Sequence, residues 1–285
     1  MTTRDNSARF AAPTPNVQPE PEEENQNAAS VPGGLHFVAP TELVELPSKG
    51  LLYPEGHPLH NQEEIEIKLM TAKEEDILVN KSLLKKGVAL DRMLQAIIVN
   101  KRIKLDDLLV SDKNAIIIAA RVSAYGADYK ASVNCPSCGL ASNYEFDLED
   151  KELKYLYEHN REDVRTAESG NFLVTLPKTN VEVEFRLLLG RDEKRLLESN
   201  KKNKGVIPLT QQFKTFIVSA NGSPDRELIS RFVDVMPAYD SKFLRLAYAD
   251  VLPAVNLEQY FECSECDHSQ EMEVPFTVEF FWPRS

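Results

Sequence analysis

Alternating and helical patterns of apolar residues follow one another from residue 64 onward. Residues 64–69 alternate strictly between polar and apolar side chains, which predicts a half-buried strand. Thr71 and Glu74 have the spacing of a capping box, so we expect a helix to begin there, with an apolar stripe that ends at Gly87. Residues 115–124 are so apolar that we expect them to form a helix at the centre of the core.

The second half of the chain mixes the same two patterns. Residues 150–165 are strongly charged and are predicted to be helical, and residues 192–200 are expected to form an exposed helix. Residues 172–176 and 181–187 predict a hairpin, because both segments alternate around a turn. Residues 207–252 are predicted to be mostly helical. One face of their first helix is predicted to carry Leu209, Phe213, Phe216 and Ile217.

The first 36 residues show no apolar period of either kind. They carry five prolines, a single aromatic residue, Phe10, and an acidic cluster at residues 22–24. Such a segment buries too little apolar surface to offset the entropy lost on ordering. We therefore expect residues 1–36 to be a disordered, acidic, proline-rich tail, either simply solvated or acting as a tether that folds on a partner. Residues 37–285 are expected to form a single α+β domain.

Composition limits the class of protein. The chain has 285 residues, of which 42% are hydrophobic and 27% are charged, and this balance is typical of a globular protein. Its net charge of −12 argues against a protein that grips nucleic acid by the phosphates. Residues 115–120 form the longest aliphatic run, which is too short to cross a bilayer. No signal-peptide pattern opens the chain, so we expect it to stay in a reducing compartment.

The four cysteines form two pairs with the same short gap. Cys135 and Cys138 make the first pair, and Cys263 and Cys266 make the second. A two-residue gap turns two thiolates toward one point, so the two pairs supply the ligands of a closed tetrahedral site for Zn²⁺. Alternating segments flank each pair, which predicts two knuckles at the tips of two hairpins. A site with four cysteine ligands leaves no position open for water, so we expect it to stabilise the fold.

Other interpretations of the cysteines fit less well. Disulfides would not persist in a reducing compartment, and a redox dithiol would leave the second pair unexplained. A zinc deaminase also needs a histidine followed two residues later by glutamate, and none of the five histidines has this spacing. His268 is an alternative fourth ligand in place of Cys266, although the set of four cysteines is already complete.

These observations predict an α+β fold with a zinc-ribbon-like β element. The two cysteine knuckles form this element, and mainly helical lobes precede it and lie between the knuckles, with residues 150–255 as the insertion. Phosphate-binding loops, nucleophile elbows and zinc-protease motifs are all missing from the sequence. We therefore expect a protein that is not an enzyme.

Seven segments carry a resemblance to a known family. They are ELPSKG at 45–50, MTAKEEDIL at 70–78, YGADY at 125–129, IVSANG at 217–222, FVDVMP at 232–237, DSKFLR at 240–245 and FFWP at 280–283. Together they resemble the T4-like bacteriophage baseplate hub assembly chaperones, a T4-type baseplate protein family. The first cysteine pair falls where that family often has one. The sequence departs at Asp267, where glycine is more usual, and in its long N-terminal tail.

The resemblance implies a phage tail protein that assembles, or forms part of, the hub of a contractile-tail baseplate. Its partners would be baseplate or tail hub proteins in a hetero-oligomeric assembly, either in the virion or in the host cytoplasm during assembly. The proline-containing residues 40–60 and the segment 280–282 are the candidate contacts, although both segments also suit packing over the protein's own core. The alternative is a zinc-ribbon module that binds nucleic acid, which the net charge disfavours.

Deleting residues 1–36 is expected to leave the melting temperature nearly unchanged, because a segment without an apolar period adds nothing to the core. Thermal unfolding of the full chain and of the truncated chain measures the difference. A drop of several degrees would mean that the tail packs against the domain. A stable truncated protein that fails to assemble with its partners would favour the tether.

Overall fold

The computed structural model describes residues 29–30, 36–37, 39–155, 161–199, 207–275 and 280–281. The chain divides into two units, residues 1–39 and residues 40–285. In the first unit, β1 (Ala29–Ser30) pairs antiparallel with β2 (His36–Phe37). The rest of the predicted tail lies outside the described residues, and so does Trp282.

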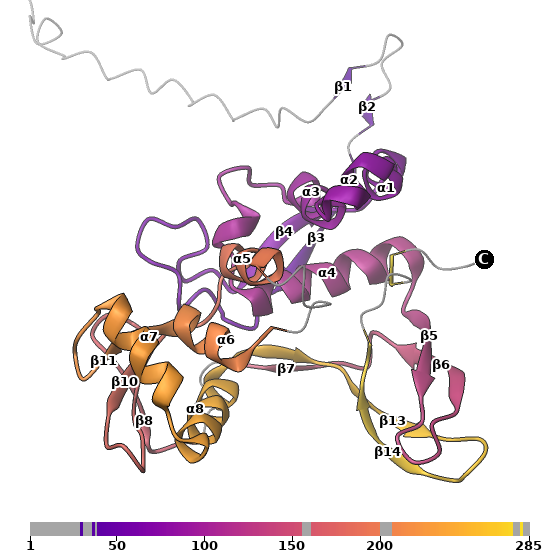
Figure 1. The fold of residues 1–285 in the computed structure, drawn as a ribbon. Coiled ribbons are helices and arrows are strands. Elements are labelled where there is room, and N and C mark those ends of the chain that lie inside the picture. Colours follow the sequence, from indigo (N-terminus) through magenta and orange to yellow (C-terminus); the bar gives the residue numbers. More distant parts are fainter. Residues whose placement is uncertain are drawn as a thin grey trace, which may run out of the picture. The chain divides into compact units, whose positions relative to one another are not determined.

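The second unit begins with an antiparallel hairpin and a group of helices (Figure 1). The strand predicted at residues 64–69 is confirmed as β4, with Ile65 and Ile67 on its buried face. The elements are β3 (Thr41–Glu45), β4 (Glu64–Lys68), α1 (Ala72–Val79), α2 (Lys81–Lys86), α3 (Ala89–Ile97), the 3-10 helix η2 (Leu105–Asp107) and α4 (Val110–Tyr125).

The helix predicted from Thr71 to Gly87 is in fact two helices. The capping box is confirmed, since the backbone N–H and the hydroxyl of Thr71 both donate to the Glu74 carboxylate. At Asn80, however, the side chain accepts the N–H groups of Ser82 and Leu83 and so caps a new helix. The expected apolar stripe therefore does not continue, and α2 has no buried residue.

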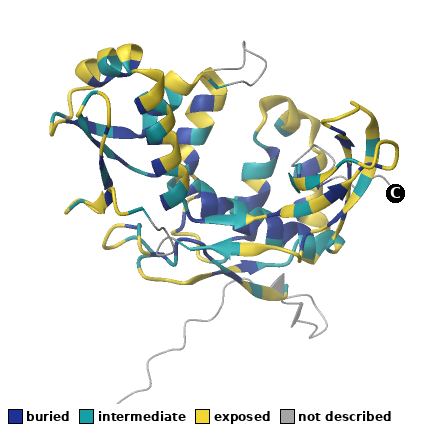
Figure 2. Ribbon diagram, turned by 90° about the horizontal axis from the view of Figure 1, so that it is seen from below, coloured by how far each residue is buried: buried dark blue, intermediate teal, exposed yellow. Residues whose placement is uncertain are grey.

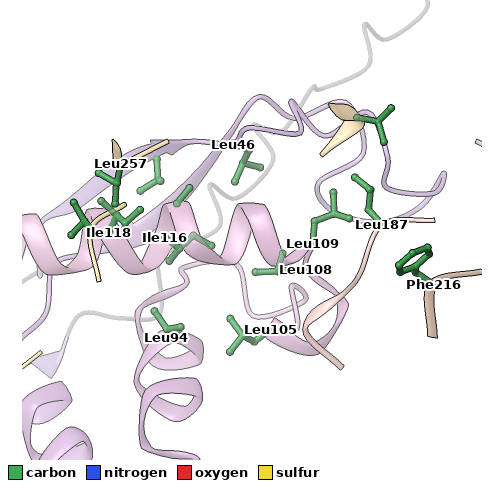
Figure 3. Packing of buried hydrophobic residues seen from close by; sticks show 14 of the residues in the cluster. Leu46, Leu94, Leu105, Leu108, Leu109, Ile116, Ile118, Leu187, Phe216 and Leu257 are labelled. Carbon is green, nitrogen blue, oxygen red and sulfur yellow. The ribbon is translucent and has the colours of Figure 1, made fainter. Parts of the chain in front are cut away.

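Helix α4 lies at the centre of the core, as its apolar sequence predicts. Ile116 and Ile118 are almost completely buried, and Figure 3 shows both among leucines that come from other elements. These neighbours include Leu46 before the helix and Leu257 far along the chain. Figure 2 shows the same pattern more widely, with buried positions where elements meet and exposed positions on their outer faces.

Three two-stranded ribbons are built from two separate stretches of the chain, one directly after α4 and one near the C-terminus. In the first stretch, Gly126 ends α4 with φ +85°, and the strands β5 (Asp128–Asn134), β6 (Ala141–Asp147) and β7 (Glu152–Lys154) follow. In the second stretch come β12 (Ala254–Asn256), β13 (Glu258–Glu262) and β14 (Ser269–Glu273). β5 pairs with β6, β13 with β14, and β7 with β12, all antiparallel. The β7–β12 ribbon thus brings the returning chain back beside its outgoing part (Figure 1).

Between the two stretches lies a lobe of helices and strands. Its four-stranded sheet has the order β11-β10-β9-β8, and the predicted hairpin is confirmed as β9 and β10. The lobe is therefore mixed, whereas a mainly helical one was expected. The elements are β8 (Val164–Thr166), β9 (Phe172–Thr175), β10 (Glu182–Phe185), α5 (Gly190–Ser199), α6 (Leu209–Phe216), β11 (Ile217–Ala220), α7 (Arg226–Val235) and α8 (Ala238–Val251).

Two predictions for this half of the chain are wrong. Residues 150–165 form no helix where the structure describes them, because one end pairs as β7 with the distant β12 and the other pairs as β8 with β9, the next strand along the chain. Ile217 does not continue the face of α6; it begins β11 and lies opposite Phe185. In both places pairing with a neighbouring strand overrides the local pattern. The exposed helix predicted at residues 192–200 is present as α5, described as far as Ser199.

Gly50 fixes the shape of the ELPSKG loop at residues 45–50. It has φ +72°, and a Cβ there would lie 2.3 Å from the carbonyl oxygen of Leu59, so only glycine fits.

The same loop is held by a buried aspartate, Asp112. The backbone N–H and the hydroxyl of Ser48 donate to the Asp112 carboxylate at 3.0 and 2.6 Å, and the Tyr53 hydroxyl donates at 2.7 Å. Burial raises the pKa of Asp112, and these three donors partly offset that effect.

Two further aspartates occupy the same place in their helices. Asp240 is the third residue of α8 and accepts the N–H groups of Lys178 and Thr179, so it fixes the turn between β9 and β10. Asp192 is the third residue of α5 and accepts two hydrogen bonds from the guanidinium of Arg186. An acidic group in the first turn is stabilised by the helix dipole, and each carboxylate also orders another segment.

Among the residues that the structure describes, no helix combines the length and the apolar character needed to cross a membrane.

Replacing Asp112 by alanine is expected to lower the free energy of unfolding by about 3 kcal/mol, because three buried donors lose their acceptor. Chemical denaturation measures the change. Ser111→Ala is the matched control, since the neighbouring Ser111 hydroxyl is buried and has no partner within the described chain. We expect Ser111→Ala to be neutral or stabilising, because it removes a buried hydroxyl that has no partner in the described chain. Equal losses in the two variants would contradict the anchoring role of Asp112.

Candidate metal centre

The two hairpins present their cysteines in the same way. In the first hairpin, Cys135 lies directly after β5, and its N–H donates to the carbonyl oxygen of Leu140 at 2.8 Å. In the second, Cys263 lies directly after β13, and its N–H donates to the carbonyl oxygen of His268 at 2.9 Å. Each pair therefore occupies a tight turn at the tip of its hairpin, which confirms the arrangement expected from the alternating flanks.

The turns share a left-handed residue just after the second cysteine. Gly139 has φ +74° in the first turn, and Asp267 has φ +54° in the second. Glycine adopts this conformation at no steric cost, and aspartate is among the few other residues that tolerate it. Position 267, where glycine is the more usual residue, is thus occupied by an aspartate that still allows the turn to form.

Aromatic packing and hydrogen bonds join the two hairpins. The ring centroids of Tyr144 and Phe261 lie 5.3 Å apart, and the Tyr144 hydroxyl donates to the carbonyl oxygen of Tyr260 at 2.8 Å. The Gln259 side chain accepts the N–H of Asp147 at 3.0 Å and returns a hydrogen bond to the Asp147 carbonyl. These side chains position the cysteines, and sequence reasoning missed them, because nothing in their spacing indicates a contact across more than 100 residues.

The four sulfur atoms converge on one point. All four lie within 4.8 Å of one another. The Cys135 and Cys266 sulfurs are 3.7 Å apart, and the Cys138 and Cys263 sulfurs are 3.8 Å apart. A tetrahedral ion with Zn–S bonds of about 2.3 Å separates its sulfurs by about 3.8 Å. The arrangement is therefore compatible with a metal ion, whereas bonded sulfurs in a disulfide lie about 2.05 Å apart.

The thiols also shift one another's pKa through hydrogen bonds between their sulfurs. The backbone N–H of Cys138 lowers the pKa of Cys135 to about 6, with help from the Ser137 N–H and against the effect of burial. The Leu140 N–H lowers the pKa of Cys138, but the neighbouring sulfurs and burial outweigh it and raise that pKa to about 12. A first thiolate thus forms readily and makes the next proton harder to remove. A bound divalent cation would offset this repulsion, so metal affinity should rise with pH.

His268 lies apart from this group of ligands. Its Nε2 is 3.3 Å from the Gln270 side chain, and the only group of three or more metal-ligating side chains found in the described part of the chain consists of the four cysteines.

The segment 280–282, proposed above as a contact, is described at two positions, and both Phe280 and Phe281 are buried. Phe280 packs edge-on against Tyr129 at 5.1 Å, so these two residues belong to the core.

Comparison with known proteins identifies one family. A family model described as "T4 bacteriophage base plate protein" matches residues 41–282, which is most of the chain. No curated protein and no solved structure matches the chain.

The purified chain is expected to contain one zinc ion, and Cys263→Ser is expected to lose it and to melt at a lower temperature. The reason is that the ion would join two hairpins distant in sequence, and its binding energy would be folding energy. Elemental analysis and thermal unfolding measure the two effects.

Ser137→Ala serves as the matched control, because Ser137 lies in the first turn with an exposed side chain. It should keep the metal and the melting temperature. Freshly purified, reduced protein without any metal would contradict the assignment.

Proposed function

The chain belongs to the T4 bacteriophage base plate protein family, and we propose that it assembles, or forms part of, the baseplate hub of a contractile tail. The observation that carries this proposal is the family match over residues 41–282. It supports a structural protein of the phage baseplate, which interacts with other baseplate proteins. The hub as its place, and a chaperone role during assembly in the host cytoplasm, are the finer parts of the proposal.

We further propose that the protein is not an enzyme and that its metal site is structural. Cys135, Cys138, Cys263 and Cys266 would hold one Zn²⁺ and complete its tetrahedral coordination. Such a site leaves no position for a water or a substrate. The role that its geometry supports is to fasten the β5–β6 and β13–β14 hairpins together, which also ties down both ends of the lobe between them.

The charge of the two hairpins supports protein partners over nucleic acid. The two hairpins, residues 128–147 and 258–273, together contain one lysine, Lys130, and no arginine. The same two segments carry nine acidic residues, all exposed: Asp128, Glu145, Asp147, Glu258, Glu262, Glu265, Asp267, Glu271 and Glu273. Four thiolates around a divalent ion would add further negative charge. Zinc ribbons that bind nucleic acid need a basic surface, so this element is better suited to a basic patch on a protein.

Co-expression with the hub proteins of the same phage is expected to give a stable complex that co-purifies with the tagged chain. A gel-shift assay with double-stranded DNA at low salt, where electrostatic attraction is strongest, is expected to show no binding. Tight, salt-sensitive DNA binding without any hub partner would contradict the proposal and favour a nucleic-acid-binding module.

A further inference from the structure

The β3–β4 hairpin has one covered edge and one open edge. On the outer side of β4, the Val99 N–H donates to the carbonyl oxygen of Glu66 at 3.1 Å, and Ile67 forms a bridge with Ile98. Leu43 lies opposite Glu66 in the register. Because the backbone groups of that pair point away from each other, the N–H and C=O of Leu43 point to the outer side of β3.

No backbone partner of Leu43 is found within the described residues, and the residue is 66% exposed. The outer edge of β3 is therefore open to pairing with another strand, as unprotected edges are.

A groove with a volume of about 320 Å³ runs beside this edge. Three parts of the fold line it: β3, the apolar side of α4, and the β7–β12 ribbon with the residues before β7. We call it the β3 groove. Its lining residues are Glu42, Leu43, Val44, Glu45, Ala115, Ile118, Ala119, Val122, Glu149, Lys151, Leu153 and Val255.

Glu42 is the unusual member of this lining. It alternates with Leu43, so it shares the inner face of β3 with the buried Val44 and lies opposite Ile67. One of its carboxylate oxygens is buried and has no hydrogen-bond partner in the described chain. Burying a carboxylate oxygen without a donor is costly, and the cost disappears when a ligand supplies the donor.

Within the described chain, no other charged residue of the groove pairs with Glu42. Glu45 is engaged, since Lys49 and the Tyr155 hydroxyl both donate to its carboxylate. Glu149 adds a further negative charge, and Lys151 is the one basic residue of the lining. The β3 groove is therefore apolar along α4 and acidic beside the open edge.

We propose that the β3 groove binds an extended segment of another baseplate protein, which adds a strand to β3 and places a lysine or arginine against Glu42. The partner class rests on the proposed function; the chemistry of the segment rests on the groove. The open edge at Leu43 selects an extended backbone, Ile118 and Val122 select an apolar side chain, and Glu42 selects a basic one two residues away, on the same face of the strand.

The first test uses a fluorescein-labelled peptide of eight residues with the repeat Val-Ser-Lys-Ser, which places valine and lysine two residues apart on one face of the strand, and titrates it into the purified full chain. Glu42→Gln is expected to weaken its binding by about tenfold or more, because a charge-assisted hydrogen bond is lost. Glu64→Gln is the matched control, since it removes the same charge from an exposed site on β4. A peptide with glutamate in place of lysine should not bind. Equal weakening in both variants would mean general attraction to an acidic protein and would overturn the proposal.

The second test separates the edge from the side chain. Leu43→Pro removes the outward N–H but no hydrogen bond to β4, whereas Leu43→Thr loses the same leucine and keeps the N–H. We expect proline to abolish peptide binding and threonine to preserve most of it, with circular dichroism showing both variants folded. Equal binding to the two variants would exclude pairing through the backbone and overturn strand addition.

The occupant is identified by a photo-cross-linking amino acid placed at position 43 of the chain co-expressed with the hub proteins. A cross-link to another baseplate protein supports the proposal. A cross-link to residues 1–38 of the same chain, or a complex that forms without any cross-link, overturns it. If no complex forms at all, the proposed function fails, and the peptide titrations still decide whether the groove binds an extended basic segment.

Discussion

Four sulfur atoms must meet at one point although they come from two distant parts of the chain. Cys135 and Cys266 are 131 positions apart and their sulfurs are 3.7 Å apart. Closing so long a loop costs conformational entropy, and the surrounding structure supplies what offsets it. The β7–β12 pairing returns the chain to its starting point, and Tyr144 and Gln259 align the two hairpins. A metal ion would then bind at a point where pairing and packing elsewhere in the fold already hold the two hairpins together.

Buried acidic groups near helix starts serve the same purpose in the rest of the molecule. Glu74, Asp112, Asp192 and Asp240 are each the third residue of a helix and each almost completely buried. Each carboxylate accepts hydrogen bonds from residues before the helix or from a distant loop. Such a group is costly to bury unless it is fully paired, so its pairing specifies one arrangement of helix and loop. One carboxylate oxygen of Glu42 lacks such pairing in the described chain, and for that reason we propose that another molecule completes this surface.

The chain thus separates the parts that hold its fold from the surfaces that we propose as partner contacts. Its anchors are buried carboxylates and converging thiols. Its outward faces are the acidic hairpins, with their single lysine, and the open edge of β3. In a baseplate, where many different subunits assemble, open strand edges and regions of one charge can select partners without changing the core.

The sequence by itself determined the elements whose pattern is local. The alternation at residues 64–69, the capping box at Thr71, the apolar α4 and the two cysteine pairs all have their signal within a few residues. What it missed depends on pairing between strands. The charged residues 150–165 look helical alone, yet the described ends of this segment become strand where β12 and β9 offer an edge, and Ile217 joins β11 because Phe185 lies beside it. The contacts of Tyr144 and Gln259 that bring the predicted cysteine ligands together, and the Glu42 oxygen that has no partner in the described chain, likewise exist only in three dimensions. Spacing along the chain determines which residues share a face, but only the tertiary structure decides which faces meet.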